Sequence, residues 1–113
     1  MLTAPPTMRK DSQMDSSQVV VVAIFRARAG REQALSTALQ AMLAPTRLES
    51  GCLNYDLHRS NDDLGLFFFH ETWVSADDHR VHLDTPHVRH LLEITPKLLL
   101  EPIRELKGTL IEE

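Results

Sequence analysis

Histidine stands out among the side chains of this sequence that could carry chemistry. The chain holds six, and four of them fall within twelve residues: His79, His82, His87 and His90. On a helix, His79 and His82 would be neighbours on one face, a geometry that suits two metal ligands or a base and the residue that orients it. The stretch has no HExxH pattern and shows no clearly placed carboxylate as a third ligand, so we expect no metal. His79, His87 and His90 are interpreted as mainly structural, with His79 solvated.

His82 is the candidate catalytic residue. Its ordinary pKa of about 6.5 suits a general acid or base at neutral pH. It lies on a predicted helix between Trp73 and Pro86, beside the expected lip of a pocket. The alternative stays open that the ring only hydrogen-bonds a backbone carbonyl and fixes the loop at Thr85 and Pro86.

A second group of candidates forms a predicted aromatic wall. Phe67, Phe69, Glu71 and Trp73 alternate along one strand, so their side chains share one face of it. Such a wall, ending in a carboxylate, suits a planar substrate, with Trp73 as the stacking platform. The alternative is a plain hydrophobic core in which Glu71 pairs with an arginine.

Tyr55 is the predicted pocket residue of the preceding strand. It shares the expected inward face with Leu53 and Leu57, because these three residues alternate with polar ones, and His58 points the other way. The Tyr55 hydroxyl would hydrogen-bond an oxygen of the substrate.

Composition and missing motifs exclude several functions. The net charge of −4, with both signs interspersed, argues against nucleic acid or an anionic membrane as partner. No GxGxxG, GxxxxGK[ST] or GxSxG motif occurs, which argues against a bound dinucleotide, a bound triphosphate and serine-hydrolase chemistry. No bound cofactor is expected. The longest apolar run, Val19 to Phe25, is far shorter than the roughly 20 residues that span a bilayer. With Cys52 as the only cysteine, a reducing, cytoplasmic location is expected.

The elements that must position these residues follow from apolar periodicity. Residues 19–29 predict a strand buried on both faces, which Gly30 ends. A helix follows from Arg31 and stops between Pro45 and Gly51, with Gly51 in a left-handed turn. The remaining predictions are a strand around 53–58, a turn at 60–63, a strand at 64–73, a helix from the N-cap Ser75 to Asp84, a break at Thr85 and Pro86, further helix at 87–92, and a last strand at 103–111.

This order predicts one α+β domain of the ferredoxin-like βαββαβ type, with an antiparallel sheet, over residues 18–113. Residues 1–17 contain two adjacent prolines and no apolar period, and we expect a disordered tail, with Met8 and Met14 as alternative starts. Adjacent residues of a strand point to opposite faces, so Phe67, Phe68 and Phe69 cannot all enter one core. A homodimer is therefore expected.

Two stretches, ESGCLNYDLHRS (49–60) and FHETWVSADDHRVHLDTPHVRHLLE (69–93), resemble the antibiotic biosynthesis monooxygenase (ABM) family, in particular its quinol-monooxygenase-like members. The resemblance implies a protomer that pairs into a dimeric α+β barrel. It also implies a small aromatic substrate and O₂ as reactants, with neither metal nor bound flavin.

Other branches of this family fit less well. The three residues that characterise the haem-degrading branch fall at Ala23, His82 and Leu92, where none is matched. Of three from the polyketide-oxidising branch only Trp73 is present, because the others fall at Phe69 and near His79. Of the branches compared, the quinol-oxidising branch shares the stretch from His82 to His87 most closely, and the resemblance places the chain there.

We therefore expect a cofactor-independent monooxygenase acting on an aromatic quinol or phenol, which His82 deprotonates for reaction with O₂. Two alternatives stay open. One is an isomerase of a small hydroxyketone, and the other is a non-catalytic dimer that binds an aromatic metabolite.

Overall fold

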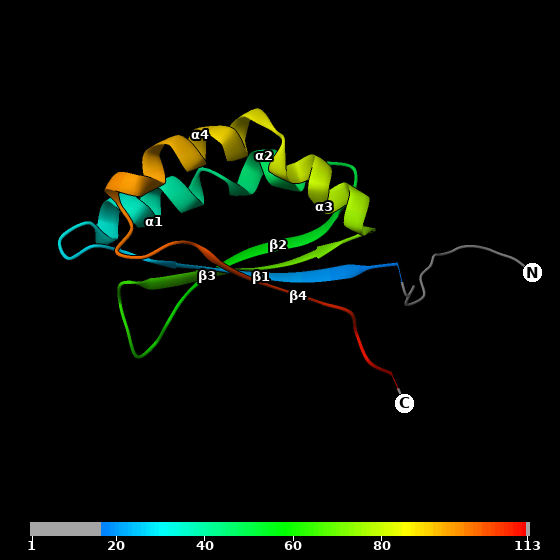
Figure 1. The fold of residues 1–113 in the computed structure, drawn as a ribbon, viewed down its shortest axis with the longest axis horizontal. Coiled ribbons are helices and arrows are strands. Elements are labelled where there is room, and N and C mark those ends of the chain that lie inside the picture. The colour runs from blue at the N-terminus through cyan, green and yellow to red at the C-terminus, as the bar shows by residue number, and fades with distance from the viewer. Residues whose placement is uncertain (1–16, 113) are drawn as a thin grey trace, which may run out of the picture.

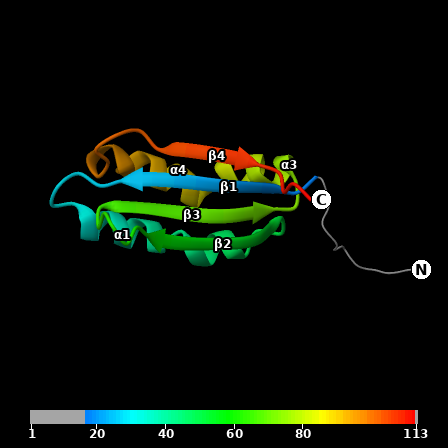
Figure 2. The ribbon, with the colours of Figure 1, turned by 90° about the horizontal axis from the view of Figure 1, so that it is seen from below.

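Four antiparallel strands form one sheet in the order β2-β3-β1-β4, in a computed structural model that describes residues 17–112. The strands are β1 (Val19–Arg26), β2 (Cys52–Arg59), β3 (Leu66–Trp73) and β4 (Arg104–Gly108). Seen from below, they lie side by side with the helices behind them (Figure 2). The predicted ferredoxin-like α+β fold is confirmed, whereas the predicted disordered tail falls almost wholly outside the described residues.

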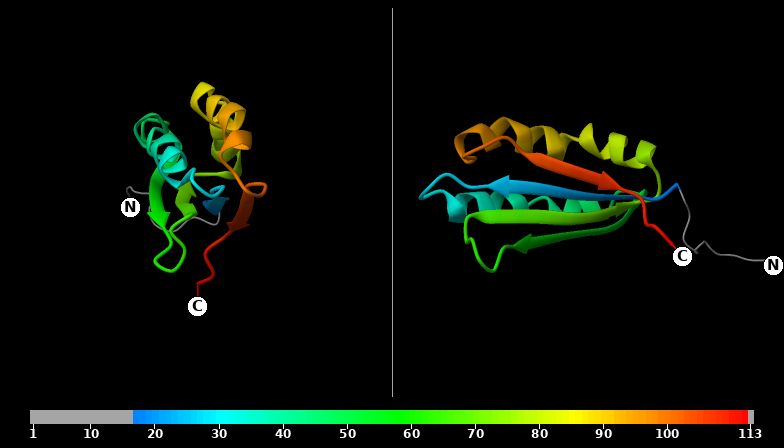
Figure 3. Two further views of the ribbon diagram at one scale, coloured as in Figure 1. Left: turned by 90° about the vertical axis from the view of Figure 1, so that its left-hand side faces the viewer. Right: turned by 60° about the horizontal axis from the view of Figure 1, so that its bottom comes forward.

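The helices cover one face of this sheet (Figure 1). They are α1 (Glu32–Gln40), α2 (Leu43–Arg47), α3 (Ala76–Leu83), α4 (Pro86–Ile94) and the short 3₁₀ helix η1 (Thr95–Lys97). Viewed from the end, α1 and α2 form one row and α3 and α4 a second row beside it (Figure 3). Among residues 17–112, no helix combines the length and apolar character needed to cross a bilayer.

β1 shows how the sheet separates a core face from an outer face. Its buried residues, Val21, Ala23 and Phe25, point toward the helices, and the residues between them are only partly buried. The prediction of a strand buried on both faces is therefore wrong, because no second layer of the described chain covers the outer face. On β3 the same alternation buries Phe67, Phe69, Glu71 and Trp73 on the helix side, which confirms the shared face predicted for them.

The start of α3 confirms the predicted N-cap Ser75, and the junction between α3 and α4 confirms the predicted break at Thr85 and Pro86. The Ser75 side chain accepts a hydrogen bond from the backbone N–H of Asp78, and the Thr85 side chain accepts one from Val88. Pro86 opens α4, where its missing N–H costs nothing. Two short helices therefore meet at Thr85 and Pro86, in place of one long helix.

The predicted first helix and last strand differ from the structure. The helix divides into α1 and α2, since Pro45 has no N–H to donate to the carbonyl of Ala41 one turn earlier. The last strand, β4, is shorter than predicted, and all five of its residues are exposed at the edge of the sheet.

Gly51 corrects a further prediction. The glycine with a positive φ is Gly30, at 84°, and not Gly51. Gly51 is needed for a different reason: a Cβ added there would lie 2.3 Å from Cγ of Asp78 on α3. Its carbonyl also accepts a hydrogen bond from the N–H of Val74 at 2.9 Å. A bare backbone at this position lets the start of β2 approach α3 closely.

We predict that Gly51→Ala destabilises the fold by about 1–3 kcal/mol, because the added methyl group must displace Asp78 and disturb its contacts with Ser75. The free energy of unfolding from urea denaturation measures the effect. Gly108→Ala is the control, since a Cβ there has no atom within 4 Å. Equal stability of the two variants would contradict this role of Gly51.

Candidate active site

A cavity lies between the sheet and the two rows of helices, with about 490 Å³ of empty space when its mouth is included. Phe25, Phe69 and Glu71 form part of its floor, and His79 and His82 of α3 lie in its wall. The lining is mostly apolar, so a bound molecule would meet few polar groups there.

Three of the predicted substrate-binding residues, Tyr55, Phe69 and Glu71, line this cavity. The Tyr55 and Phe69 rings are stacked, with centroids 4.4 Å apart and an interplanar angle of 24°. Among residues 17–112, Glu71 has no arginine partner; its Oε1 accepts a hydrogen bond from Nε1 of Trp73 at 2.8 Å. These side chains form a flat apolar surface with a carboxyl group at one end.

Phe67 and Trp73 share the same strand face but are not among the residues that line the cavity. Trp73 is fully buried at the end of β3, and its ring centroid lies 4.6 Å from that of His82 and 5.9 Å from that of His79. The indole therefore backs the two histidines. Its place beneath α3 argues against the stacking platform predicted from the sequence.

His82 is held through one ring nitrogen. Its Nδ1 lies 2.8 Å from Oε2 of Glu49, and only 3% of the residue is exposed. The alternative in which the ring bonds a backbone carbonyl is not realised, because the loop bond runs from the Thr85 hydroxyl to the His82 carbonyl. Within residues 17–112, Nε2 of His82 has no hydrogen-bond partner and is the nitrogen left for a ligand.

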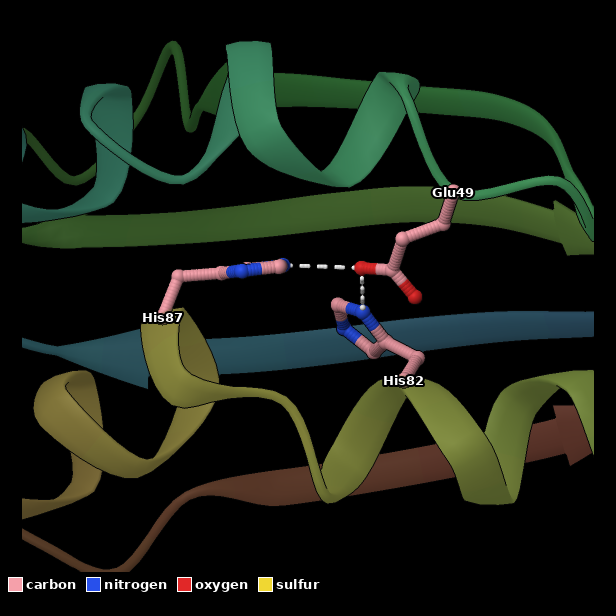
Figure 4. A group of neighbouring side chains, drawn as sticks. All are labelled: Glu49, His82 and His87. Atoms are coloured by element: carbon pink, nitrogen blue, oxygen red, sulfur yellow. Dashed lines mark hydrogen bonds and ion pairs between the residues drawn. The ribbon is translucent and has the colours of Figure 1, made fainter.

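Glu49 is the candidate site residue that sequence reasoning missed. The same Oε2 atom lies 2.8 Å from Nε2 of His87, so one carboxylate oxygen joins α3 and α4 (Figure 4). Glu49 lies 33 residues before His82, in the segment that leads into β2. A sequence signal existed, because Glu49 opens the stretch ESGC that carried the family resemblance.

Burial and charge set the protonation of these groups. Burial lowers the pKa of His82, although the hydrogen bond to Glu49 acts in the opposite direction. His82 is therefore neutral at pH 7 and able to accept a proton. A carboxylate can only accept hydrogen bonds, so Nδ1 of His82 and Nε2 of His87 carry the donated protons.

His79 and Glu71 form a second polar group in the cavity wall. His79 was expected to be solvated but is only 2% exposed. Its Nε2 is buried with no hydrogen-bond partner among the described residues, 3.7 Å from Oε2 of Glu105. Burial lowers the pKa of His79 and raises the pKa of Glu71 to about 7. A substrate oxygen could satisfy both groups.

Comparison with known proteins places this architecture in a family. The profile described as "Antibiotic biosynthesis monooxygenase" (ABM) matches residues 18–93. The Mycobacterium tuberculosis protein named "Putative monooxygenase Rv0793" is 37% identical over 90 residues, which cover 78% of this chain and 86% of that protein.

Solved structures agree with this match. The structure of Rv0793 superposes with a TM-score of 0.81 at 33% identity, covering 86% of this chain and 98% of that one. PA3566 from Pseudomonas aeruginosa has a TM-score of 0.82 at 29% identity, with 89% and 100% covered. The profile's range, residues 18–93, spans the positions of Glu49, His82 and His87. The chain thus belongs to the antibiotic biosynthesis monooxygenase family.

Proposed function

We propose that this protein is a cofactor-independent monooxygenase that acts on an aromatic quinol or phenol. The observation that carries the proposal is the hydrogen bond between Glu49 and His82, which itself lies in the wall of an apolar cavity. Glu49 holds the proton on Nδ1 of His82, which leaves the lone pair of Nε2 for a substrate hydroxyl.

The reaction needs little more than a base and a dry cavity. Nε2 of His82 takes the proton of a quinol hydroxyl, and the resulting anion is electron-rich enough to reduce O₂ itself. One oxygen atom forms a new bond to a ring carbon, and the other leaves as water with two hydrogens of the substrate. The products are a hydroxyquinone and one water molecule, so no external reductant is consumed.

Substrate contacts follow from the cavity wall. The stacked rings of Tyr55 and Phe69 offer an apolar surface to a planar substrate. Burial raises the pKa of Tyr55, so its phenol stays protonated and can donate to a substrate oxygen. Nε2 of His79 and the carboxyl of Glu71 can bond a second oxygen. This combination favours an aromatic substrate over a small hydroxyketone, which would leave the apolar surface unused.

Metal-free protein should consume O₂ when incubated with menadiol under air, at a rate above that of buffer. His82→Ala should lower this rate by about 10²-fold or more, since the base is lost. An oxygen electrode measures the rate, and His90→Ala, at an exposed histidine of α4, is the matched control.

Two results would contradict the proposal: no uptake above buffer, or uptake that survives His82→Ala. An anaerobic incubation with a hydroxyketone separates the competing reaction class, because isomerisation requires the base but no oxygen. Turnover under those conditions, without turnover of the quinol in air, would assign the protein to isomerases.

Glu71 should make stability depend on pH. Its pKa of about 7 lies above its ordinary 4.5, so between these values the folded chain keeps a proton that the unfolded chain has lost. Stability from this group is thus lost as pH rises from 4.5 to 7 and is constant above 7.

Glu71→Gln keeps the acceptor for Trp73 and cannot ionise. The variant should therefore become more stable than wild type across this interval, by about 3 kcal/mol at most. Denaturation at several pH values measures the difference. Glu93→Gln, at an exposed carboxylate of α4, is the control, and a difference for Glu71→Gln that does not change with pH would refute the buried-carboxyl assignment.

A homodimer is the proposed assembly. The outer face of the sheet carries an apolar set on three adjacent strands, hereafter the outer patch: Val20, Val22, Ile24, Phe68 and Leu106. Strand pairing brings Ile24 beside Phe68 and Val22 beside Leu106, so the outer patch is continuous. No described helix covers it (Figure 2). Pairing of two such faces would bury them and agrees with the resemblance to dimeric α+β barrels.

Phe68→Glu should convert a dimer of twice 12.8 kDa into a monomer, because it places a charge in the middle of the outer patch. Light scattering coupled to size exclusion reports the mass. Leu48→Glu is the control, since Leu48 is 86% exposed at the end of α2, on the helix side. A wild-type monomer, or a dimer that persists in Phe68→Glu, would argue against this interface.

A further inference from the structure

We propose that Glu49, His82 and His87 also form a binding site for a divalent transition-metal ion such as Zn²⁺, and that the bound ion switches off the base at His82. Metal binding at these residues does not depend on the proposed function. Inhibition by the bound metal rests on the proposed function.

The ligand atoms already converge. Oε2 of Glu49 lies 2.8 Å from Nδ1 of His82 and 2.8 Å from Nε2 of His87, and the three ligand atoms all lie within 4.8 Å of one another. Zinc bonds of about 2.0–2.1 Å in a tetrahedron keep ligand atoms about 3.4 Å apart. Each short pair must therefore open by about 0.6 Å, which side-chain rotation can supply.

The chemistry of the donors suits zinc. Two imidazoles and one glutamate are the ligands of a known class of zinc sites, in which the fourth position stays open for water or a substrate atom. The carboxylate supplies a negative charge, and neutral imidazoles supply lone pairs without repelling a cation. Sequence reasoning paired His79 with His82 and lacked a carboxylate; the structure instead pairs His82 with His87 around Glu49 (Figure 4).

Access and rigidity also agree with an ion site. The His82 side chain is 4% exposed and packs on Trp73, whereas the side chains of Glu49 and His87 are 15% and 21% exposed. An ion can therefore reach the site from the side of His87.

Binding of the ion would move the proton of each histidine. Without metal, Nδ1 of His82 and Nε2 of His87 donate to Glu49, so the lone pairs are on the opposite nitrogens. An ion takes its electron pairs from Nδ1 of His82 and Nε2 of His87, which places each proton on the other nitrogen of its ring. No proton is gained or lost. Nε2 of His82 then carries a hydrogen and cannot accept one from a substrate.

Equilibrium dialysis of the full chain against ZnCl₂, with metal content measured by mass spectrometry, tests metal binding. One zinc per chain is expected in wild type. Glu49→Gln and His87→Ala should each weaken binding by at least about tenfold, and His90→Ala should not change it. Thermal denaturation confirms that each variant is folded, and Glu49→Gln is nearly isosteric with wild type.

Co²⁺ supplies a second readout, because the intensity of its visible absorption reports a site of low coordination number. Absence of stoichiometric zinc, or binding that persists in both ligand variants, overturns the site. Such a result would leave the metal-free reaction untouched.

Inhibition is measured on the same samples. Zinc should lower quinol-dependent O₂ uptake with the same midpoint as binding, and a chelator should restore the rate. Tight zinc binding with unchanged uptake overturns the switch while leaving the site. Zinc binding in a protein that never consumes O₂ with a quinol refutes the proposed function alone.

Discussion

One carboxylate oxygen, Oε2 of Glu49, organises the helix side of this protein. It accepts hydrogen bonds from His82 on α3 and His87 on α4, and Glu49 itself comes from the segment that enters β2. A carboxylate taken this far from water costs several kcal/mol unless donors satisfy it. Two imidazole N–H groups do so, and in return they are fixed in one orientation. Glu49 therefore fixes the orientation of His82, the member of this group that lines the cavity.

The position of Glu49 depends on how the backbone packs at Gly51, two residues later in the chain. Gly51 lets the strand start lie against Asp78, and the N–H of Val74 bonds the Gly51 carbonyl. These contacts set the distance between the entry to β2 and α3, and thus the distance over which Glu49 must reach. The hydrogen bond from His82 to Glu49 and the close approach of Gly51 to α3 therefore depend on the same spacing between α3 and the start of β2.

Much of this could be predicted from local sequence rules. The alternation from Phe67 to Trp73 gave the correct shared face, Ser75 capped α3 as expected, and the helix broke at Thr85 and Pro86 as expected, because these features depend on neighbouring residues only. Glu49 could not be found in this way, since its partners lie 33 and 38 residues away. Periodicity likewise cannot say that α3 lies above Trp73, which decides whether that ring lines a cavity or supports a histidine. Tertiary contacts settled what patterns left open.

The break at Thr85 and Pro86 allows His82 and His87 to face the same oxygen atom of Glu49. In a straight helix, positions 82 and 87 would point about 140° apart around the axis, because each residue turns the chain by about 100°. Two histidines on one such helix could not share a single oxygen atom. A residue that cannot join the helical hydrogen-bond ladder thus redirects the second histidine toward the first. Pro86 thus does more than end a helix. It sets the angle between α3 and α4, and this angle lets Nδ1 of His82 and Nε2 of His87 reach the same oxygen of Glu49.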